Sequence, residues 1–464
     1  FLYLLPCGLS TSNYMSKKAV LSYVVDRNTG LWKALSGCSA SQQEIPGSDI
    51  YKTERFTEEE LPPQVDLRSF MTPVENQAGA NSCTANAVVG GYEYVMNRVG
   101  QELDFSRLFV YYNARVLGLE HFGQDKIQDQ GSSITLALMS LQEKGICHES
   151  TWAYEVTENG KVKNVNTQPV SHAYKEAAKL LNVPDFQWET PEQVSVELYS
   201  MKHCLAEGYP FIFGLTLFKS FDRVTAKGRV PMPDLNSDEG REEHGKHAML
   251  CVGYKDSAEV FIVRNSWGEE WADGGYCYIP YEYMTNSDLC FECWKIKGIT
   301  DFDLSEDIWD QEDEDFDEEF YEEEDAEEQE NCYLTLVESI AVICLYGADV
   351  DGLSDEESEL LAGLYESYEI DTESLEEKIN NLLEIGGFEL LYNAAIQIIL
   401  AEDAAEEAFQ MSVEFALADE CFSDEEYEYW TKLGQDLELD NDRATELFNE
   451  VLEEYDYEPF ESLF

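Results

Sequence analysis

Basic residues are scarce in this 464-residue chain, where 30 Lys and Arg stand against 95 Asp and Glu and give a formal net charge of −65 at pH 7. Negative charge on this scale repels the phosphates of nucleic acids and anionic membrane surfaces. We therefore expect neither nucleic acid nor a membrane among the partners. The charge favours divalent cations or a basic protein instead.

Long apolar runs and regularly spaced cysteines are missing as well. No stretch of the chain reaches the roughly 20 apolar residues that a membrane-spanning helix needs. The apolar opening, residues 1–13, lacks the basic region of a signal peptide. The 12 cysteines do not follow the spacing of a disulfide framework, and such scattered cysteines are typical of reducing compartments. We expect a cytoplasmic protein, with secretion as the alternative.

The acidic residues are unevenly distributed along the chain. After residue 300 lie 56 of the 95 acidic residues but only 3 of the 30 basic ones. Residues 301–331 consist mostly of Asp and Glu and cannot bury a core. The pattern predicts four parts: an N-terminal segment over 1–60, a mixed domain over 61–300, an acidic linker over 301–331 and an all-helical domain over 332–464.

The mixed domain has helical patterns first and strand patterns afterwards. Apolar residues recur with helical spacing in three segments, and short β-rich runs follow. This order predicts an α+β domain. The expected helices cover 83–99, 133–145 and 190–208, and the expected strands cover 210–218, 247–254, 260–265 and 275–281.

One cysteine stands just ahead of a long helical pattern in "QAGANSCTANAVVGGYEYVM", residues 77–96. Asn81 or Ser82 can cap this helix, which places Cys83 in its first turn. Free N–H groups at a helix N-terminus stabilise a thiolate, so Cys83 is a candidate nucleophile with a strongly depressed pKa. Cysteine also packs as a small apolar residue. Whether Cys83 is a nucleophile or a core residue depends on whether the chain supplies a base.

The segment "HGKHAMLCVGYKDSAEVFIVRNSWG" supplies both a base and a residue to orient it. Residue 256, in the turn between the two strand patterns, lies halfway between His247 and Asn265. A hairpin folded there makes the two side chains cross-strand neighbours on one face. The Asn carbonyl then accepts the imidazole N–H and fixes its tautomer without adding charge. His244 is a competing base, but it belongs to a charged loop.

Three segments resemble the signature blocks of the papain-like cysteine peptidases. They are "LPPQVDLRSFMTPVENQAGANSCTANA", "HAMLCVGY" and "RNSWGEEWADGGY", in the order that the family has them. The connecting segments "DFSRLFVYYNAR" and "GSSITLALMSLQEKGICHESTWAYE" are similar to the bacterial, xylellain-like branch. The resemblance covers about residues 61–297 and implies a helical lobe and a β-barrel-like lobe with the active site between them.

The resemblance also implies roles for individual residues. Cys83 matches the nucleophile, His247 the general base and Asn265 the residue that orients the base. Gln77 matches the side-chain donor to the oxyanion, which acts with the Cys83 backbone N–H. The resemblance further assigns Trp267 to shielding the His–Asn hydrogen bond in the substrate site, and Gly131, Ser132 and Ser133 to docking the substrate backbone. No cofactor is expected for catalysis.

Two departures from the family pattern are informative. The family has a cysteine three positions before the nucleophile, where this chain has Ala80, so the disulfide that begins there is absent. Residues 1–60 lie where a pro-segment belongs, but they are too short and irregular for a long helical pro-domain. A short tethered segment can still inhibit by lying extended across the cleft. A leader without such a role is the alternative.

The helical domain contains a degenerate repeat rich in acidic turns. The segment "CLYGADVDGLSDEESELLAGLYESYEI" resembles the TerB-like domain of tellurite-resistance proteins, whose acidic turns are implicated in metal binding. Asp349, Asp351 and Asp419 are therefore candidate ligands of a divalent cation. These segments lack the ligand spacing and the distal Glu of a calcium-binding loop. The alternative interpretation is that the aspartates belong to acidic turns and helix N-caps and bind no metal.

These observations predict a cysteine-type endopeptidase that acts on polypeptides through a thioester acyl-enzyme and is regulated or targeted by its acidic helical domain. The same catalytic residues also support acyl transfer or deamidation. A different alternative is a non-catalytic scaffold whose acidic region binds metal or a basic partner.

Overall fold

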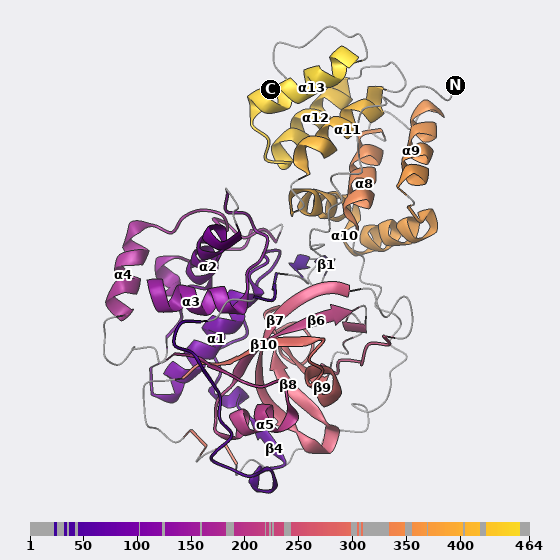
Figure 1. Cartoon of the computed structure of the whole chain (residues 1–464). Helices are drawn as coiled ribbons and strands as arrows, with labels where there is room; N and C mark the ends of the chain where they lie inside the picture. Colours follow the sequence, from indigo (N-terminus) through magenta and orange to yellow (C-terminus); the bar gives the residue numbers. More distant parts are fainter. Residues whose placement is uncertain are drawn as a thin grey trace.

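The computed structural model describes residues 23–25, 32–34, 37–41, 45–101, 103–122, 126–157, 160–181, 190–218, 220–221, 224, 227–235, 243–297, 304–305, 308–309, 334–348, 355–368, 370–401, 404–417 and 424–454. These residues build two large hydrophobic cores, one within residues 38–308 and one within residues 334–452. Figure 1 shows the first body in indigo to pink and the second, all-helical body in orange and yellow. The predicted α+β fold followed by an all-helical region is confirmed.

Helices form one lobe of the α+β body. They are α1 (Cys83–Arg98), α2 (Arg107–Phe122), α3 (Ile134–Lys144) and α4 (Ser171–Leu181). Helix α1 is central, because it contacts α2 and α3 on one side and strand β7 (Glu243–Lys255) on the other. A Cβ on Gly91 would lie 3.3 Å from Leu250 Cδ1. Glycine in a helix interior is about 1 kcal/mol less stabilising than alanine, but here it lets α1 approach the sheet closely.

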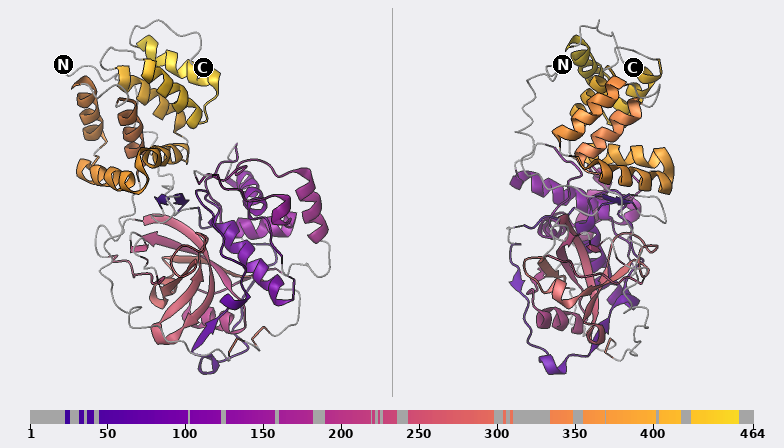
Figure 2. Two further views of the ribbon diagram at one scale, coloured as in Figure 1. Left: turned by 180° about the vertical axis from the view of Figure 1, so that it is seen from behind. Right: turned by 90° about the vertical axis from the view of Figure 1, so that its right-hand side faces the viewer.

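An eight-stranded sheet forms the other lobe (Figure 2). Its strand order is β3-β5-β10-β6-β7-β8-β9, with β4 paired to β7. Every residue of β6 is buried, so this strand lies at the centre of the core. Besides β7, the strands are β3 (Asp49–Ile50), β4 (Gln64–Asp66), β5 (Glu192–Gln193), β6 (Phe211–Phe218), β8 (Val260–Arg264), β9 (Tyr276–Pro280) and β10 (Cys290–Lys295). Two short helices, α5 (Leu198–Ala206) and α6 (Tyr281–Met284), pack on it.

The predicted elements mostly match this lobe, with one clear error. Strands β6, β8 and β9 agree with the predicted strands within one residue at each end, and β7 begins at Glu243, four residues before its predicted start. The helix predicted over residues 190–208 begins only at Leu198. Its first part is wrong because Glu192 and Gln193 pair with β10 in the sheet, and tertiary pairing overrides a weak helical pattern.

Residues 45–60 belong to the α+β body although their polar sequence suggested an irregular segment. Ile45 and Tyr51 are buried in its core. The Tyr51 hydroxyl lies 2.5 Å from His203 Nδ1 and donates to Glu207 Oε2 at 2.8 Å. Further towards the N-terminus, β1 (Tyr23–Val25) and β2 (Trp32–Ala34) form a two-stranded sheet of their own among the described strands. Within the predicted N-terminal segment, residues 45–60 are thus an integral part of the α+β fold, whereas β1 and β2 lie outside its main sheet.

Among the residues that the structure describes, the second body consists of helices α8 (Leu336–Ala348), α9 (Asp355–Ser367), α10 (Thr372–Ala401), α11 (Ala405–Ala416), α12 (Asp424–Asp436) and α13 (Asn441–Glu454). Helix α10 is interrupted at Gly387, whose φ of 68° is non-helical. Trp430 and Phe448 are fully buried, and their ring centroids lie 5.2 Å apart. Within the described ranges, no helix has both the length and the apolar character that crossing a bilayer would require.

Candidate active site

Cys83 is the first residue of α1, as the sequence predicted. Ser82, one of the two predicted caps, occupies the N-cap position, but its side chain makes no capping hydrogen bond. The Ser82 hydroxyl lies 2.7 Å from the Tyr154 hydroxyl and accepts from Asn86 Nδ2 at 3.0 Å. Asn81 instead donates from Nδ2 to the backbone oxygen of Asp129 at 2.9 Å. The backbone N–H groups of Cys83 and Thr84, in the first turn of α1, interact with the Cys83 thiol instead.

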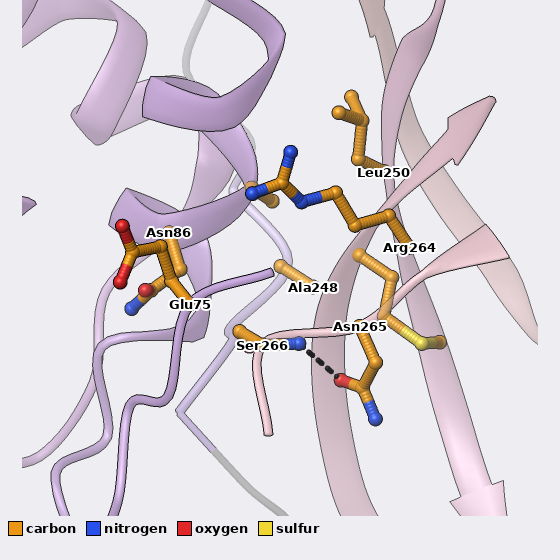
Figure 3. A pocket seen from close by; sticks show the side chains of 9 residues that line it. Glu75, Asn86, Ala248, Leu250, Arg264, Asn265 and Ser266 are labelled. Carbon is orange, nitrogen blue, oxygen red and sulfur yellow. Dashed lines mark hydrogen bonds between the residues drawn. The ribbon is translucent and has the colours of Figure 1, made fainter. Parts of the chain in front are cut away.

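His247 and Asn265 meet through a single hydrogen bond, with 2.8 Å between Nε2 and Oδ1. The backbone N–H of Ser266 donates to the same Oδ1 at 2.8 Å (Figure 3) and so fixes the amide orientation. Because Oδ1 can only accept, His247 Nε2 must carry the proton. His247 Nδ1 then bears the lone pair, and within the described part of the chain this buried atom has no hydrogen-bond partner.

The register of the β7–β8 hairpin differs from the predicted one. Leu250 pairs with Arg264 and Lys255 with Val260, and a bulge interrupts the ladder between Cys251 and Gly253. Continued along the strands, this register would set residue 249, not His247, opposite Asn265. Direct cross-strand pairing of the two residues is therefore wrong, although their side chains do meet.

Burial controls the charge of the two residues that would react. Burial raises the pKa of the Cys83 thiol to about 12 and outweighs the lowering by the backbone N–H groups of Ala248, Thr84 and Cys83 itself. Burial likewise lowers the pKa of His247 to about 4, although its hydrogen bond to Asn265 raises it. In this closed state the site holds a neutral thiol and a neutral imidazole. The predicted strong depression of the thiol pKa is wrong for this state, because neither group is exposed to water.

Gln77 is held at both ends of its side chain. Its Nε2 donates to the backbone oxygen of Ala80 at 2.9 Å, and its Oε1 accepts from the Ser266 hydroxyl at 2.6 Å. Its backbone N–H also donates to the Ser266 oxygen at 2.7 Å. Gln77 therefore links the loop before Cys83 to the loop after Asn265 and keeps a second amide hydrogen for another acceptor.

Trp267 covers the imidazole. The His247 and Trp267 ring centroids lie 5.2 Å apart, and Trp271 packs edge-on against Trp267 at 5.0 Å. The indole is only 3% exposed. Because the indole is buried over His247, it is placed to exclude water from the His–Asn hydrogen bond and not to contact a substrate directly.

The three residues assigned to substrate docking have different surroundings. Gly131 has a φ of 82°, and a Cβ there would lie 2.5 Å from the Gly37 oxygen. Ser132 exchanges backbone hydrogen bonds with the N-terminal segment, since its N–H donates to Gly37 O and its oxygen accepts from Ser39 N, both at 2.9 Å. The Ser133 hydroxyl accepts from Leu136 N at 3.1 Å and caps α3, so this side chain serves the helix.

Residues 37–41, which we call the strap, lie against both lobes at this site. On the helical lobe, Gly37 packs so closely that a Cβ would lie 2.6 Å from Asn81 O. On the sheet lobe, Cys38 N donates to Lys246 O at 2.9 Å, next to His247. The strap and Ser132 form a parallel bridge. The residues around Cys83 and His247 are thus contacted by a segment of the same chain.

Asp129 and Tyr111 are site residues that the sequence reasoning missed. Asp129 Oδ1 accepts from Asn81 N at 3.0 Å and from the Tyr111 hydroxyl at 2.5 Å. The Tyr111 oxygen in turn accepts from Gly131 N at 3.0 Å. This network ties the loop before Cys83 to the segment under the strap. No sequence signal pointed to this network.

Metal binding has no structural support among the residues with described positions, where no group of three or more His, Cys, Asp or Glu side chains could hold an ion. The candidate ligands Asp349, Asp351 and Asp419 lie outside the described residues. All nine cysteines that the structure describes are free thiols.

Comparison with known proteins bears on the α+β body. Residues 61–290 match the model of the papain family cysteine proteases. A peptidase C1-like protein of Acanthamoeba polyphaga mimivirus, itself uncharacterized, is 31% identical over 248 residues, which are 51% of this chain and 75% of that protein. The chain belongs to the papain family of cysteine proteases.

Other papain-family proteins are similar over the same region. Cysteine proteinase 3 of Entamoeba histolytica is 23% identical over 220 residues, and the chain spans 61% of its length. Xylellain, a cysteine protease from Xylella fastidiosa with a solved structure, has 30% sequence identity to this chain and a TM-score of 0.49. The match covers 57% of this chain and 96% of the xylellain chain. The family match ends at residue 290, so the TerB-like resemblance of the helical body stays a prediction.

Proposed function

We propose that this papain-family protease is an endopeptidase whose nucleophile is Cys83, whose general base is His247 and whose orienting residue is Asn265. The hydrogen bond from His247 Nε2 to Asn265 Oδ1 carries the proposal. It leaves the Nδ1 lone pair as the proton acceptor, and that atom is buried without a partner in the described part of the chain.

The reaction begins when the Cys83 thiol gives its proton to His247 Nδ1. The sulfur attacks the carbonyl carbon of the peptide, and the carbonyl oxygen becomes an oxyanion held by the Cys83 N–H and the remaining Gln77 amide hydrogen. The imidazolium then protonates the departing amine, which leaves a thioester on Cys83. His247 next removes a proton from water, and the resulting attack releases the carboxylic acid and restores the thiol.

A thiol-directed epoxide tests the assignment of the nucleophile. In the chain lacking residues 1–41, which has lost the strap over Cys83, mass spectrometry after treatment should find one adduct, on Cys83. In the same shortened chain Cys83→Ala should show none, whereas Cys147→Ala, which removes a buried cysteine of a separate small cluster, should be labelled like its parent. Labelling that persists in Cys83→Ala would reject the assignment. Products of amide transfer or deamidation, in place of cleaved peptide, would reject endopeptidase activity.

We further propose that the strap keeps the site latent. Its backbone is hydrogen-bonded to Ser132 and Lys246, and Cys83 beneath it is fully buried. Tethering gives such a segment a high effective concentration even when its individual contacts are weak. Once the strap leaves, water can reach the site, and the burial that raises the thiol pKa is reduced.

Deletion of residues 1–41 tests latency; it removes Cys38 from the core but keeps the buried residues Ile45 and Tyr51. Hydrolysis of a small peptide substrate should increase, and the pH at which Cys83 becomes alkylated should decrease. The matched control is deletion of residues 1–34, which keeps the strap and should stay latent. Equal activity of the two truncated proteins would leave the N-terminal segment as a leader without this role.

For the acidic helical body we propose a regulatory or targeting role through a basic protein partner or divalent cations. The excess of acidic residues after residue 300 supports this role. Titration of the full chain with Ca²⁺, followed by the unfolding temperature, tests the cation alternative. An unchanged unfolding temperature would leave only the protein partner. A cytoplasmic location remains part of this proposal.

A further inference from the structure

Two thiols that the catalytic proposal does not use lie against each other in β10. The Sγ atoms of Cys290 and Cys293 are 3.7 Å apart, and both residues are 1% exposed. Both belong to the segment "CFEC", in which two residues separate the cysteines. A disulfide has an S–S distance of about 2.05 Å, so a small local movement would join them.

The backbone between the two cysteines is irregular. The pairing of β10 with β6 shifts register between Phe291 and Trp294, which places the irregularity at Glu292 and Cys293. Glu292 has a φ of 49°, in the left-handed region that non-glycine residues seldom occupy. Such a bulge is the part of a strand that can rearrange without breaking the whole ladder.

Glu292 connects this bulge to the strap and to the helical lobe. One carboxylate oxygen accepts from the backbone N–H of Ser41 in the strap. The other accepts from Thr135 N at 3.0 Å and from Thr135 Oγ1 at 3.2 Å, in the first turn of α3. Any rotation of the backbone at Glu292 therefore acts on the strap directly.

We propose that Cys290 and Cys293 form a dithiol–disulfide switch that controls how Glu292 holds the strap. Joining the two sulfurs draws residues 290 and 293 together and turns Glu292, which lies between them. The carboxylate then loses Ser41, and the strap is released from the sheet lobe. The reduced pair keeps the strap in place.

The oxidant is a peroxide, small enough to reach the thiol pair when the bulge at Glu292 opens briefly. The hydrogen bond to Cys290 raises the pKa of the Cys293 thiol, which assigns the second attack to Cys293 and the first reaction to Cys290. Its sulfur attacks a peroxide oxygen, the O–O bond breaks, and a sulfenic acid and water form. The Cys293 sulfur then attacks the Cys290 sulfur and expels the hydroxyl as water. Two thiols lose two hydrogens in total, and one peroxide becomes two waters.

The test uses the full chain carrying Cys83→Ala, so that oxidation of the proposed nucleophile does not interfere. Hydrogen peroxide should yield a peptide in which Cys290 and Cys293 are linked, identified by mass spectrometry. Amide hydrogen exchange at Ser39 and Ser41 should become about tenfold faster and return to its initial rate after treatment with a dithiol. Cys290→Ser/Cys293→Ser should show slow exchange with or without peroxide, and Cys147→Ser should respond like the parent protein.

Three results would overturn the switch: no link between Cys290 and Cys293, a link with unchanged exchange in the strap, or faster exchange in the double Ser variant as well. The functional consequence rests on the proposed latency, but the exchange measurement does not depend on activity. If oxidation loosens the strap while deletion of residues 1–41 leaves activity unchanged, the latency fails and the switch stands.

Discussion

At the scale of single residues, the proposed catalytic set is a chain of hydrogen bonds that determines which nitrogen of His247 carries the proton. Ser266 N–H fixes Asn265 Oδ1, Asn265 fixes the Nε2 proton of His247, and the lone pair is left on Nδ1. Residue types and their spacing suggested Cys83, His247 and Asn265. Their protonation states could not be predicted, because burial by distant segments sets both pKa values.

Asn265→Ala removes the acceptor for His247 Nε2–H and leaves the imidazole free to turn. We expect kcat to fall about 100-fold, with KM nearly unchanged, because Asn265 acts through its hydrogen bond with His247. Steady-state kinetics on the chain lacking residues 1–41 measures both constants. The control is Asn97→Ala, whose amide only donates to Phe70 O at the other end of α1. An increase confined to KM would contradict an orienting role.

At the scale of elements, long and strongly patterned segments were predictable and short ones were not. Helix α1 ends within one residue of its predicted bounds, because its apolar residues repeat without a break. Strand β10 was missed, since the bulge at Glu292 interrupts its alternation. The strap was suggested only through the family resemblance, because five polar and small residues carry no periodicity that would identify their partners.

Helix α1 also carries a buried acid, Glu93, which makes its stability depend on pH. Glu93 accepts from Phe105 N and from the Thr72 hydroxyl, each at 2.9 Å, and burial raises its pKa to about 7. The folded-state pKa thus exceeds the unfolded value of about 4.3. The folded protein therefore holds this proton more tightly, and that stabilisation is complete below about pH 4 and is lost as the pH rises to about 7.

Glu93→Gln keeps the shape of the side chain and removes its titration. Relative to the wild type, the variant should gain stability between pH 5 and pH 8, by up to about 3 kcal/mol. Urea unfolding at the two pH values gives the free energy of unfolding of each protein. A difference between variant and wild type that is the same at both pH values would show that Glu93 does not titrate in this range.

At the scale of the whole molecule, two cores are joined by a strongly acidic sequence. The α+β core and the helical core are separate clusters, and the composition change near residue 300 had indicated this division. The comparisons identify only the first body. The buried core of the second is apolar, while its excess of like charges opposes a compact state.

Separate cores predict two thermal transitions. Raising the NaCl concentration should increase the unfolding temperature of the helical body by several degrees more than that of the α+β body, because salt screens repulsion among its carboxylates. Calorimetry of the full chain measures both transitions. A chain ending at residue 310, which keeps the Trp309 hydrogen bond to Ala206 O, should show only the transition with the smaller salt dependence. One concerted transition in the full chain would contradict independent bodies.

The central claim, that peptide bonds are cleaved through a thioester on Cys83, is tested most directly by trapping that thioester. The chain lacking residues 1–41 is mixed with a peptide ester, quenched in acid during turnover and digested for mass spectrometry. We predict an acyl group on the peptide that contains Cys83 and none in the Cys83→Ala protein, which should also lose turnover. An acyl group on another residue, or turnover that continues in Cys83→Ala, would contradict the claim.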